Sequence, residues 1–138
     1  MANGRTDRRV RKTKALLLRG LIQLMETKDV QDISVKELSD LVDINRGTFY
    51  LHYSDVHDML RQIEDELFVE FQGIIDRTLT PDSAIHSPQT TLSEVFVFLE
   101  RHRETARVMM GPHGDLAFLN RLKDLVQERL DSILASKL

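Results

Sequence analysis

The sequence predicts an all-α protein, with a three-helix N-terminal domain that contains a helix-turn-helix and a short or truncated helical domain after it. Apolar residues recur at spacings of three and four along the chain, and no stretch alternates with the period of a β-strand. Capping and hydrophobic-staple residues mark the starts of several helices. The three prolines lie between the apolar stretches rather than inside them. Together these patterns indicate helices joined by short connections.

The first predicted helix covers residues 7–28, after a polar terminal segment, 1–7, that we expect to be disordered. Its apolar residues, such as Leu17 and Leu21, keep helical spacing. Residues 1–20 carry seven Lys or Arg and one acidic residue, whereas the rest of the chain totals −9. This asymmetry indicates that one end of the chain meets a polyanion, although a solvated basic tail is the alternative.

The second predicted helix covers residues 34–41. Ser34 is its capping residue, and Glu37 three residues later completes a capping box. Ile33 before the cap and Leu38 after the first turn form a hydrophobic staple. The capping box and the hydrophobic staple therefore both place the start of this helix at Ser34.

The third predicted helix runs from Asn45 to about residue 51. Asn45 is a preferred capping residue, and Ile44 and Phe49 occupy the staple positions. In the preceding connection, Asp43 is one of the few non-glycine residues that tolerate a left-handed backbone. Two short helices this close must cross at a steep angle, as in a helix-turn-helix. We expect Phe49 and Tyr53 to lie in the core of the three small helices.

The fourth predicted helix begins at Ser54 or Asp55 and runs to about Thr78, with one continuous apolar face. Metal-ligating residue types gather around its start. Aspartate is favoured at a helix start by the helix dipole, so we expect no metal site there. The residues concerned are His52, Asp55, His57 and Asp58.

The sequence from residue 80 onward predicts two more helices. Residues 80–88 form a loop, and Thr91 with Glu94 makes a capping box that opens the fifth helix. The sequence Gly-Pro-His-Gly at 111–114 interrupts the chain. A last amphipathic helix follows from Asp115.

Composition excludes several classes of function. Without cysteine, the chain has no disulfide, thiolate metal site or cysteine nucleophile. No apolar run approaches the roughly 20 residues that span a bilayer, and no signal-peptide core follows the basic N-terminus, so we expect a cytoplasmic protein without a membrane partner. No nucleophile elbow, zinc-protease pattern or phosphate-binding loop occurs, and we therefore predict neither an enzyme nor a cofactor.

Residues 45–53, Asn-Arg-Gly-Thr-Phe-Tyr-Leu-His-Tyr, resemble the signature of the TetR family of bacterial transcriptional regulators, and the resemblance extends over about 12–60. The family pattern is Ser or Asn, any residue, Gly-Thr, an aromatic residue or Leu, Tyr, any residue, His, and Phe or Tyr. Residues 44–50 are also similar to a Firmicutes-type subgroup related to dihydroxyacetone-kinase regulators. The resemblance implies a DNA-binding domain at 1–53 and an apparently incomplete domain for regulation, ligand binding and dimerisation at 54–138.

By this resemblance the protein is an effector-responsive repressor that binds a double-stranded operator as a homodimer, with an unknown small-molecule effector. Val56 stands where many members place a Lys that meets a phosphate, and Ser54 replaces a frequently charged residue. We therefore expect fewer phosphate contacts from the fourth helix. Asp43 replaces the usual turn glycine. The family usually has more regulatory helices than the three predicted here, so the sequence leaves dimerisation and a complete ligand pocket open.

The third helix is expected to enter the major groove of DNA. Arg46 is the best candidate for reading a base, because its planar guanidinium can bond both acceptors of a guanine edge. Thr48 can offer a hydroxyl or pack its methyl on thymine, and Gly47 lets the backbone approach the DNA closely. A merely solvated charge is the alternative for Arg46.

Other residues are expected to hold phosphates. The resemblance assigns this role to Tyr50 and His52, and such contacts fix the register of the protein on DNA. Ser34 and Lys36 lie at the start of the second helix, whose exposed amides also attract phosphate. The basic segment 5–14 would lie along the DNA backbone or reach the minor groove. The predicted DNA-binding residues are Arg8, Arg9, Ser34, Lys36, Asn45, Arg46, Gly47, Thr48, Tyr50 and His52.

A helical protein–protein interaction module or co-regulator that does not bind DNA is the alternative function. Val56 and the acidic remainder of the chain slightly favour it. Such a protein would show no salt-dependent DNA binding.

Overall fold

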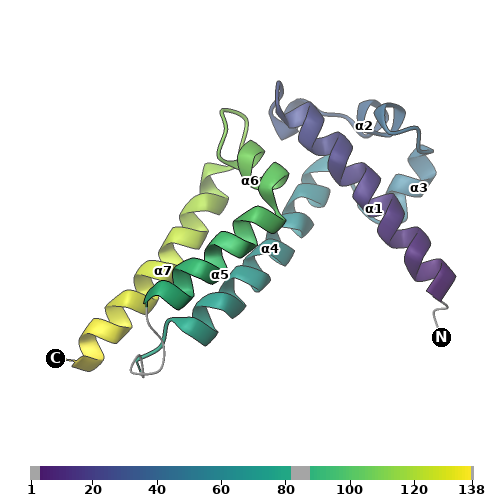
Figure 1. The fold of residues 1–138 in the computed structure, drawn as a ribbon. Coiled ribbons are helices and arrows are strands. Elements are labelled where there is room, and N and C mark those ends of the chain that lie inside the picture. Colours follow the sequence, from purple (N-terminus) through teal and green to yellow (C-terminus); the bar gives the residue numbers. More distant parts are fainter. Residues whose placement is uncertain (1–3, 82–87, 138) are drawn as a thin grey trace. The chain divides into compact units, whose positions relative to one another are not determined.

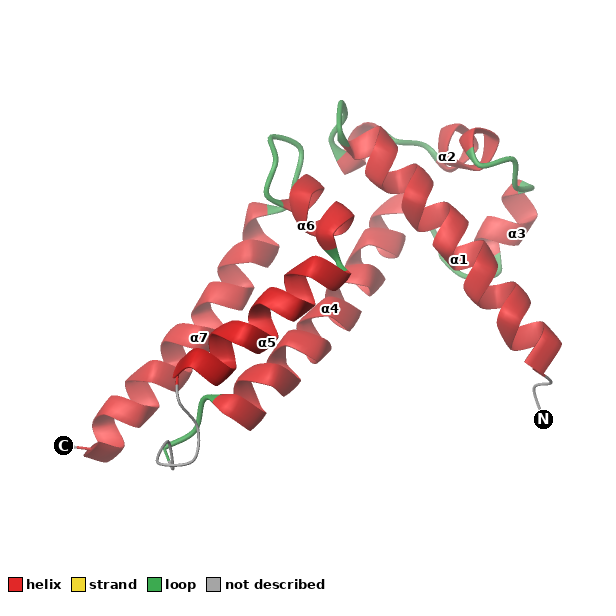
Figure 2. Ribbon diagram, viewed as in Figure 1, coloured by secondary structure: helices red, strands yellow, loops and turns green. Residues whose placement is uncertain are grey.

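A computed structural model of the chain describes residues 4–81 and 88–137. Within these two stretches every regular element is helical, which confirms the predicted all-α class (Figures 1 and 2). None of the described helices combines the length and the apolar character that crossing a membrane requires. The elements are α1 (Gly4–Met25), the 3-10 helix η1 (Val30–Asp32), α2 (Val35–Leu41), α3 (Arg46–Tyr50), α4 (Val56–Thr78), α5 (Pro88–Arg101), α6 (Arg103–Met109) and α7 (Leu116–Lys137).

The chain divides into two compact units. The first comprises the described residues up to Arg61 together with Gly111–Gly114, and the second comprises Gln62–Met110 together with the described residues from Asp115 onward. Helix α4 contributes residues 56–61 to the first unit and 62–78 to the second.

The core of the first unit is built by α1, α2, α3 and the start of α4. Its centre consists of apolar side chains that are at most 1% exposed, namely Leu17, Leu21, Leu38, Phe49 and Met59. Gly20 allows α1 and α2 to approach closely, because a Cβ atom there would lie 2.5 Å from Cγ1 of Val42. In the same unit, Nδ1 of His113 lies 2.7 Å from Oδ1 of Asp29.

The predicted limits of the first helix need correction at both ends. Helix α1 already begins at Gly4, inside the segment expected to be disordered, and residues 1–3 lie outside the described residues. Arginine is a good helix former and Asp7 lies in the first turn, where the helix dipole favours an acid, so this segment extends the helix. The helix ends at Met25 rather than residue 28, because Thr27 and Asp29 are poor helix formers.

The predicted caps of the helix-turn-helix are present. The amide of Glu37 donates to Oγ of Ser34 at 3.0 Å, and the amide of Gly47 donates to Oδ1 of Asn45 at 2.7 Å. Asp43 has a φ of 58°, the left-handed conformation expected of it. The capping box of α2 is only half formed, since the Glu37 carboxylate accepts a hydrogen bond from Nζ of Lys28 at 2.6 Å instead.

The second unit has its core between α4, α5 and α7. Phe71, Ile74 and Ile75 of α4 pack with Phe98 of α5, and partly buried leucine and valine side chains of α7 pack against them. Ion pairs tie the helices together at the surface, including Arg77 with Glu94, Arg121 with Asp65, and Arg129 with Asp76.

The fifth predicted helix differs from the structure in two ways. Helix α5 begins at Pro88, before the predicted cap, because proline is well suited to the first position of a helix. The Thr91 hydroxyl has no hydrogen-bond partner in the described part of the chain, and Glu94 pairs with Arg77. The helix then breaks at His102, which gives a separate helix α6. Of the predicted loop, residues 82–87 lie outside the described residues.

Candidate nucleic-acid interface

Helix α3 is held by one buried side chain and presents the opposite side to solvent. Phe49 is fully buried, and its ring centroid lies 5.5 Å from that of Tyr53, which is also buried. Tyr50 is 55% exposed, and its ring forms a T-shaped pair with that of Phe49, at 5.6 Å between centroids. The assignment of Tyr53 to the core is therefore confirmed, whereas Tyr50 has its hydroxyl available on the surface.

The residues predicted to read bases lie together at the start of α3. Asn45, Arg46 and Gly47 are exposed and Thr48 is half-buried. The Arg46 side chain makes no hydrogen bond or ion pair with the described residues, so all its guanidinium donors are available to a ligand. Oδ1 of Asn45 already accepts the hydrogen bond that caps α3, so the main role of this residue is to fix the start of the helix. A Cβ at position 47 would meet that oxygen at 3.1 Å, so glycine leaves room for the cap.

The residues predicted to hold phosphates are also accessible. His52 is half-buried, with its ring 6.2 Å from that of Tyr53. The Lys36 side chain is 69% exposed and pairs with Asp40, one helical turn away, at 2.8 Å. An exposed pair of this kind contributes little to stability, about 0.3–0.5 kcal/mol, and leaves the lysine able to bind a phosphate instead. Ser34 is exposed and caps α2.

The basic N-terminal segment is helical where it is described. Arg8 and Arg9 lie on exposed positions of α1 and therefore extend from a helix rather than from a flexible arm. Lys14, on the same helix, places Nζ 5.8 Å from the centre of the Tyr53 ring. Sequence reasoning missed this contact, because the two residues lie far apart in the chain.

Around the start of α4, the aspartates serve as caps. The amide of Asp58 donates to Oδ1 of Asp55 at 2.7 Å, and the amide of Ser54 donates to Oδ2 of Asp58 at 2.9 Å. The described residues contain no group of three or more histidine and acidic side chains arranged to hold a metal ion. Val56 is 3% exposed, so the residue at this position belongs to the core.

The second unit contains a small apolar cavity of about 60 Å³ between its four helices. This volume exceeds the space that one water molecule needs. The polar groups in its wall are His102, whose Nε2 lies 2.9 Å from Oε2 of Glu70, and Thr105. The lining residues are Leu67, Phe98, Leu99, His102, Thr105, Ala106, Met109, Met110, Phe118, Leu119 and Leu122.

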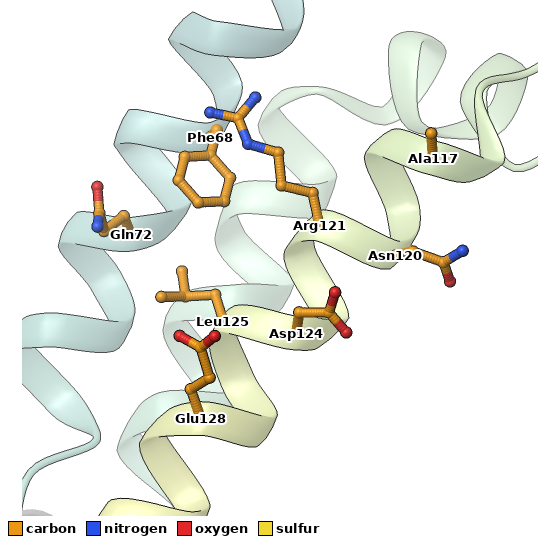
Figure 3. A pocket seen from close by; sticks show the side chains of 8 residues that line it. All are labelled: Phe68, Gln72, Ala117, Asn120, Arg121, Asp124, Leu125 and Glu128. Carbon is orange, nitrogen blue, oxygen red and sulfur yellow. The ribbon is translucent and has the colours of Figure 1, made fainter.

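A wider and more open groove of about 390 Å³ lies between α4 and α7. Figure 3 shows Phe68 and Gln72 on one side of it, and Arg121, Asp124 and Glu128 among the side chains of α7 on the other. The groove is lined by the positively charged Arg121 and by the negatively charged Asp124 and Glu128, so it does not favour a ligand of one sign of charge.

Comparison with known proteins identifies a relative that is described as a transcriptional regulator. The chain is 22% identical over 100 residues to the uncharacterized HTH-type transcriptional regulator YxbF of Bacillus subtilis (strain 168). The matched region is 71% of this chain but only 26% of that protein, so the chain spans about a quarter of the length of its relative. No family model matches the chain, and no solved structure matches it.

Proposed function

We propose that the protein is a sequence-specific DNA-binding transcriptional regulator of the TetR family, an effector-responsive repressor that acts as a homodimer. The observation that carries the proposal is the start of α3, where exposed Arg46 and Tyr50 flank the fully buried Phe49. A short helix fixed from behind by an aromatic side chain presents its polar residues in one arrangement, as recognition of a base edge requires. The helix-turn-helix relative supports the same proposal.

Readout and positioning are divided between the residues of the interface. Arg46 would donate both guanidinium hydrogen bonds to a guanine edge, and Thr48 would contact the neighbouring base. Tyr50, His52 and Lys36 would bind phosphates and fix the register of α3 in the groove. The exposed arginines of α1 would add attraction that does not depend on sequence.

Titration of DNA with the Arg46→Ala variant tests the proposal. The DNA is the region upstream of the protein's own coding sequence, and a shuffled duplex of equal length serves as competitor. We expect a loss of about 1–3 kcal/mol of specific binding and a relaxed preference at one base pair. Arg103→Ala, which removes an exposed arginine of the second unit, is the matched control and should bind normally. Unchanged affinity and preference in Arg46→Ala would refute the assignment.

For the effector, we propose the apolar cavity among α4, α5, α6 and α7. The effector would be a small apolar molecule, and the cavity of about 60 Å³ would have to open to admit it, because benzene occupies a cavity of roughly 150 Å³. Its binding would shift the DNA-binding equilibrium only if the two states differ in affinity for it. A thermal-shift screen with small aromatic compounds tests this, because a ligand that binds the folded state raises the melting temperature. Ala106→Phe, which fills the cavity, should abolish any such shift; an equal shift in that variant would place the site elsewhere.

For the homodimer, we propose an interface that includes the exposed apolar side chains of α5 and α7. On α5, Leu92 and Phe96 are 57% and 67% exposed, and on α7, Leu134 is 63% exposed. Two-fold partners would place two copies of α3 on two half-sites of an operator. Sedimentation equilibrium tests this: Phe96→Glu should shift the wild-type dimer toward monomer, and a monomeric wild type would refute it.

A protein–protein interaction module is the second candidate. Leu51, directly after α3, is 79% exposed, and Leu41 at the end of α2 is 41% exposed. Apolar side chains beside the recognition helix suit a protein partner better than a phosphate backbone. This candidate predicts that the DNA titration above shows no binding even at low salt.

A further inference from the structure

Two carboxyl groups meet where α7 begins beside α4. Glu64 of α4 is only 8% exposed, and its side chain is hydrogen-bonded to that of Asp115, the residue before α7. Two carboxyl groups in contact cannot both ionise readily, because the second charge would face the first at short range. One of the two therefore holds a proton, and the more buried group is the better candidate.

Within residues 4–81 and 88–137, no cationic side chain forms an ion pair with Glu64. Its Oε2 atom is buried and has no hydrogen-bond partner in the described part of the chain. The charged groups facing it are Asp65 on its own helix, Asp115, and Arg121 of α7. Arg121 is already engaged, since its guanidinium lies 3.0 Å from Oδ1 of Asp65 and stacks 3.9 Å from the centre of the Phe68 ring (Figure 3).

Burial is the largest cause that raises the pKa of Glu64, followed by the hydrogen bond to Asp115 and the negative charges of Asp115 and Asp65. Arg121 lowers the pKa of Glu64 only in part, and the result is about 8 instead of the ordinary 4.5. At neutral pH the side chain is thus a neutral acid that can donate a hydrogen bond to Asp115.

Asp115 links this proton to the start of α7. Its Oδ1 accepts a hydrogen bond from the amide of Phe118 at 3.2 Å, which caps the helix. Phe118 and Leu119, in the first turn of α7, also line the apolar cavity of the second unit. Asp115 therefore connects the Glu64 carboxyl to the helix cap, to the first turn of α7 and to the cavity wall.

We propose that Glu64 is a proton switch that controls the docking of the first turn of α7 on α4. Protonated Glu64 donates to Asp115 and holds the turn in place, whereas ionised Glu64 repels Asp115 and loosens the turn and the cavity behind it. The switch acts inside the second unit and does not depend on DNA binding.

The sign of the pH dependence follows from the raised pKa. Between pH 4.5 and about 8 the folded protein keeps a proton that the unfolded chain has lost. Stability is consequently greatest at or below pH 4.5 as far as this group is concerned, and it falls progressively until the pH passes about 8.

Two measurements on the full chain test the switch. The first is a ¹³C NMR titration of the Glu64 side-chain carboxyl. The second is thermal unfolding from pH 5.5 to pH 9 for the wild type and three variants. Glu64→Gln mimics the neutral acid, Asp115→Asn removes the facing charge but keeps an acceptor, and Glu66→Gln makes the same change at an exposed position of α4.

We expect Glu64 to titrate near pH 8 in the wild type and at lower pH in Asp115→Asn. Glu64→Gln should lose most of the fall in melting temperature toward alkaline pH, and Glu66→Gln should keep it. Titration of Glu64 near its ordinary value would overturn the proposal, as would an unfolding profile of Glu64→Gln that coincides with the wild type. Neither measurement contains DNA, so failure of the proposed regulator function leaves this test intact.

Discussion

The two units of the protein differ in what they leave exposed. In the first unit the side chains that position α3, above all Phe49, are closed off from solvent, and the caps of α2 and α3 are satisfied. In the second unit, apolar side chains of α5 and α7 such as Phe96 and Leu134 are exposed, and one carboxyl oxygen of the buried Glu64 has no hydrogen-bond partner among the described residues. The first unit fixes the polar residues of α3 from behind, as the proposed DNA interface requires, whereas the second leaves the apolar surface and the buried acid on which the proposed dimer and proton switch depend.

The largest expected difference in the free energy of unfolding is between alanine variants of two phenylalanines, Phe49 and Phe96. Phe49→Ala should destabilise the protein by about 3–5 kcal/mol, because it leaves a cavity in a closed core. Phe96→Ala should change the free energy of unfolding of the monomer by less than about 0.5 kcal/mol, because its side chain is already in solvent. Urea unfolding at low protein concentration measures both. Equal destabilisation by the two substitutions would contradict the distinction between the units.

Removal of residues 1–9 should weaken binding to all DNA sequences alike. The described residues of this segment are exposed, so folding should be retained, while Arg5, Arg8 and Arg9 are lost. With each phosphate contact contributing about 0.9 to the salt dependence, the slope of log affinity against log salt should decrease by up to about 3. DNA titrations at several salt concentrations measure this; an unaltered slope would show that the segment does not contact DNA.

Loss of the hydrogen bond that caps α3 should lower the stability of the first unit moderately. Asn45→Ala removes the acceptor of the Gly47 amide and should destabilise the first unit by about 1 kcal/mol. Asn120→Ala makes the same change at an exposed position inside α7 and should not destabilise. Urea unfolding of both variants checks this, and equal stability of Asn45→Ala and the wild type would show that the cap is dispensable.

The smallest expected change in stability is that of the Lys36→Ala variant. This replacement should alter stability by no more than about 0.5 kcal/mol, since it breaks only an exposed ion pair with Asp40. The salt slope of DNA binding should nevertheless decrease by about 0.9 if Lys36 binds one phosphate. Lys123→Ala, on the exposed side of α7, is the matched control. A DNA-binding salt slope that is the same for both variants would remove Lys36 from the interface.

Local features of the fold could be predicted from sequence, and features that depend on distant contacts could not. The caps at Ser34 and Asn45 and the left-handed Asp43 are set by residues within a few positions of each other, and all three occur as expected. The break between α5 and α6 at His102 could not be predicted, because the sequence has no glycine or proline there to mark it.

The same division holds for the candidate sites. The exposed start of α3 followed from the signature around Arg46, since helical spacing alone separates buried Phe49 from its exposed neighbours. Glu64 has the appearance of an ordinary polar residue in the sequence. Only the packing of α7 against α4 buries its carboxyl group and brings it to Asp115.

The most direct test of the central claim is the affinity of the wild-type protein for its own upstream DNA, measured against a shuffled duplex with the solution mass determined in parallel. A regulator of this kind should bind the upstream DNA at least about 10³-fold more tightly than the shuffled duplex, with an affinity that falls as salt rises, and should do so as a species with the mass of a dimer. Equal binding to both duplexes, or no binding at low salt, would contradict it.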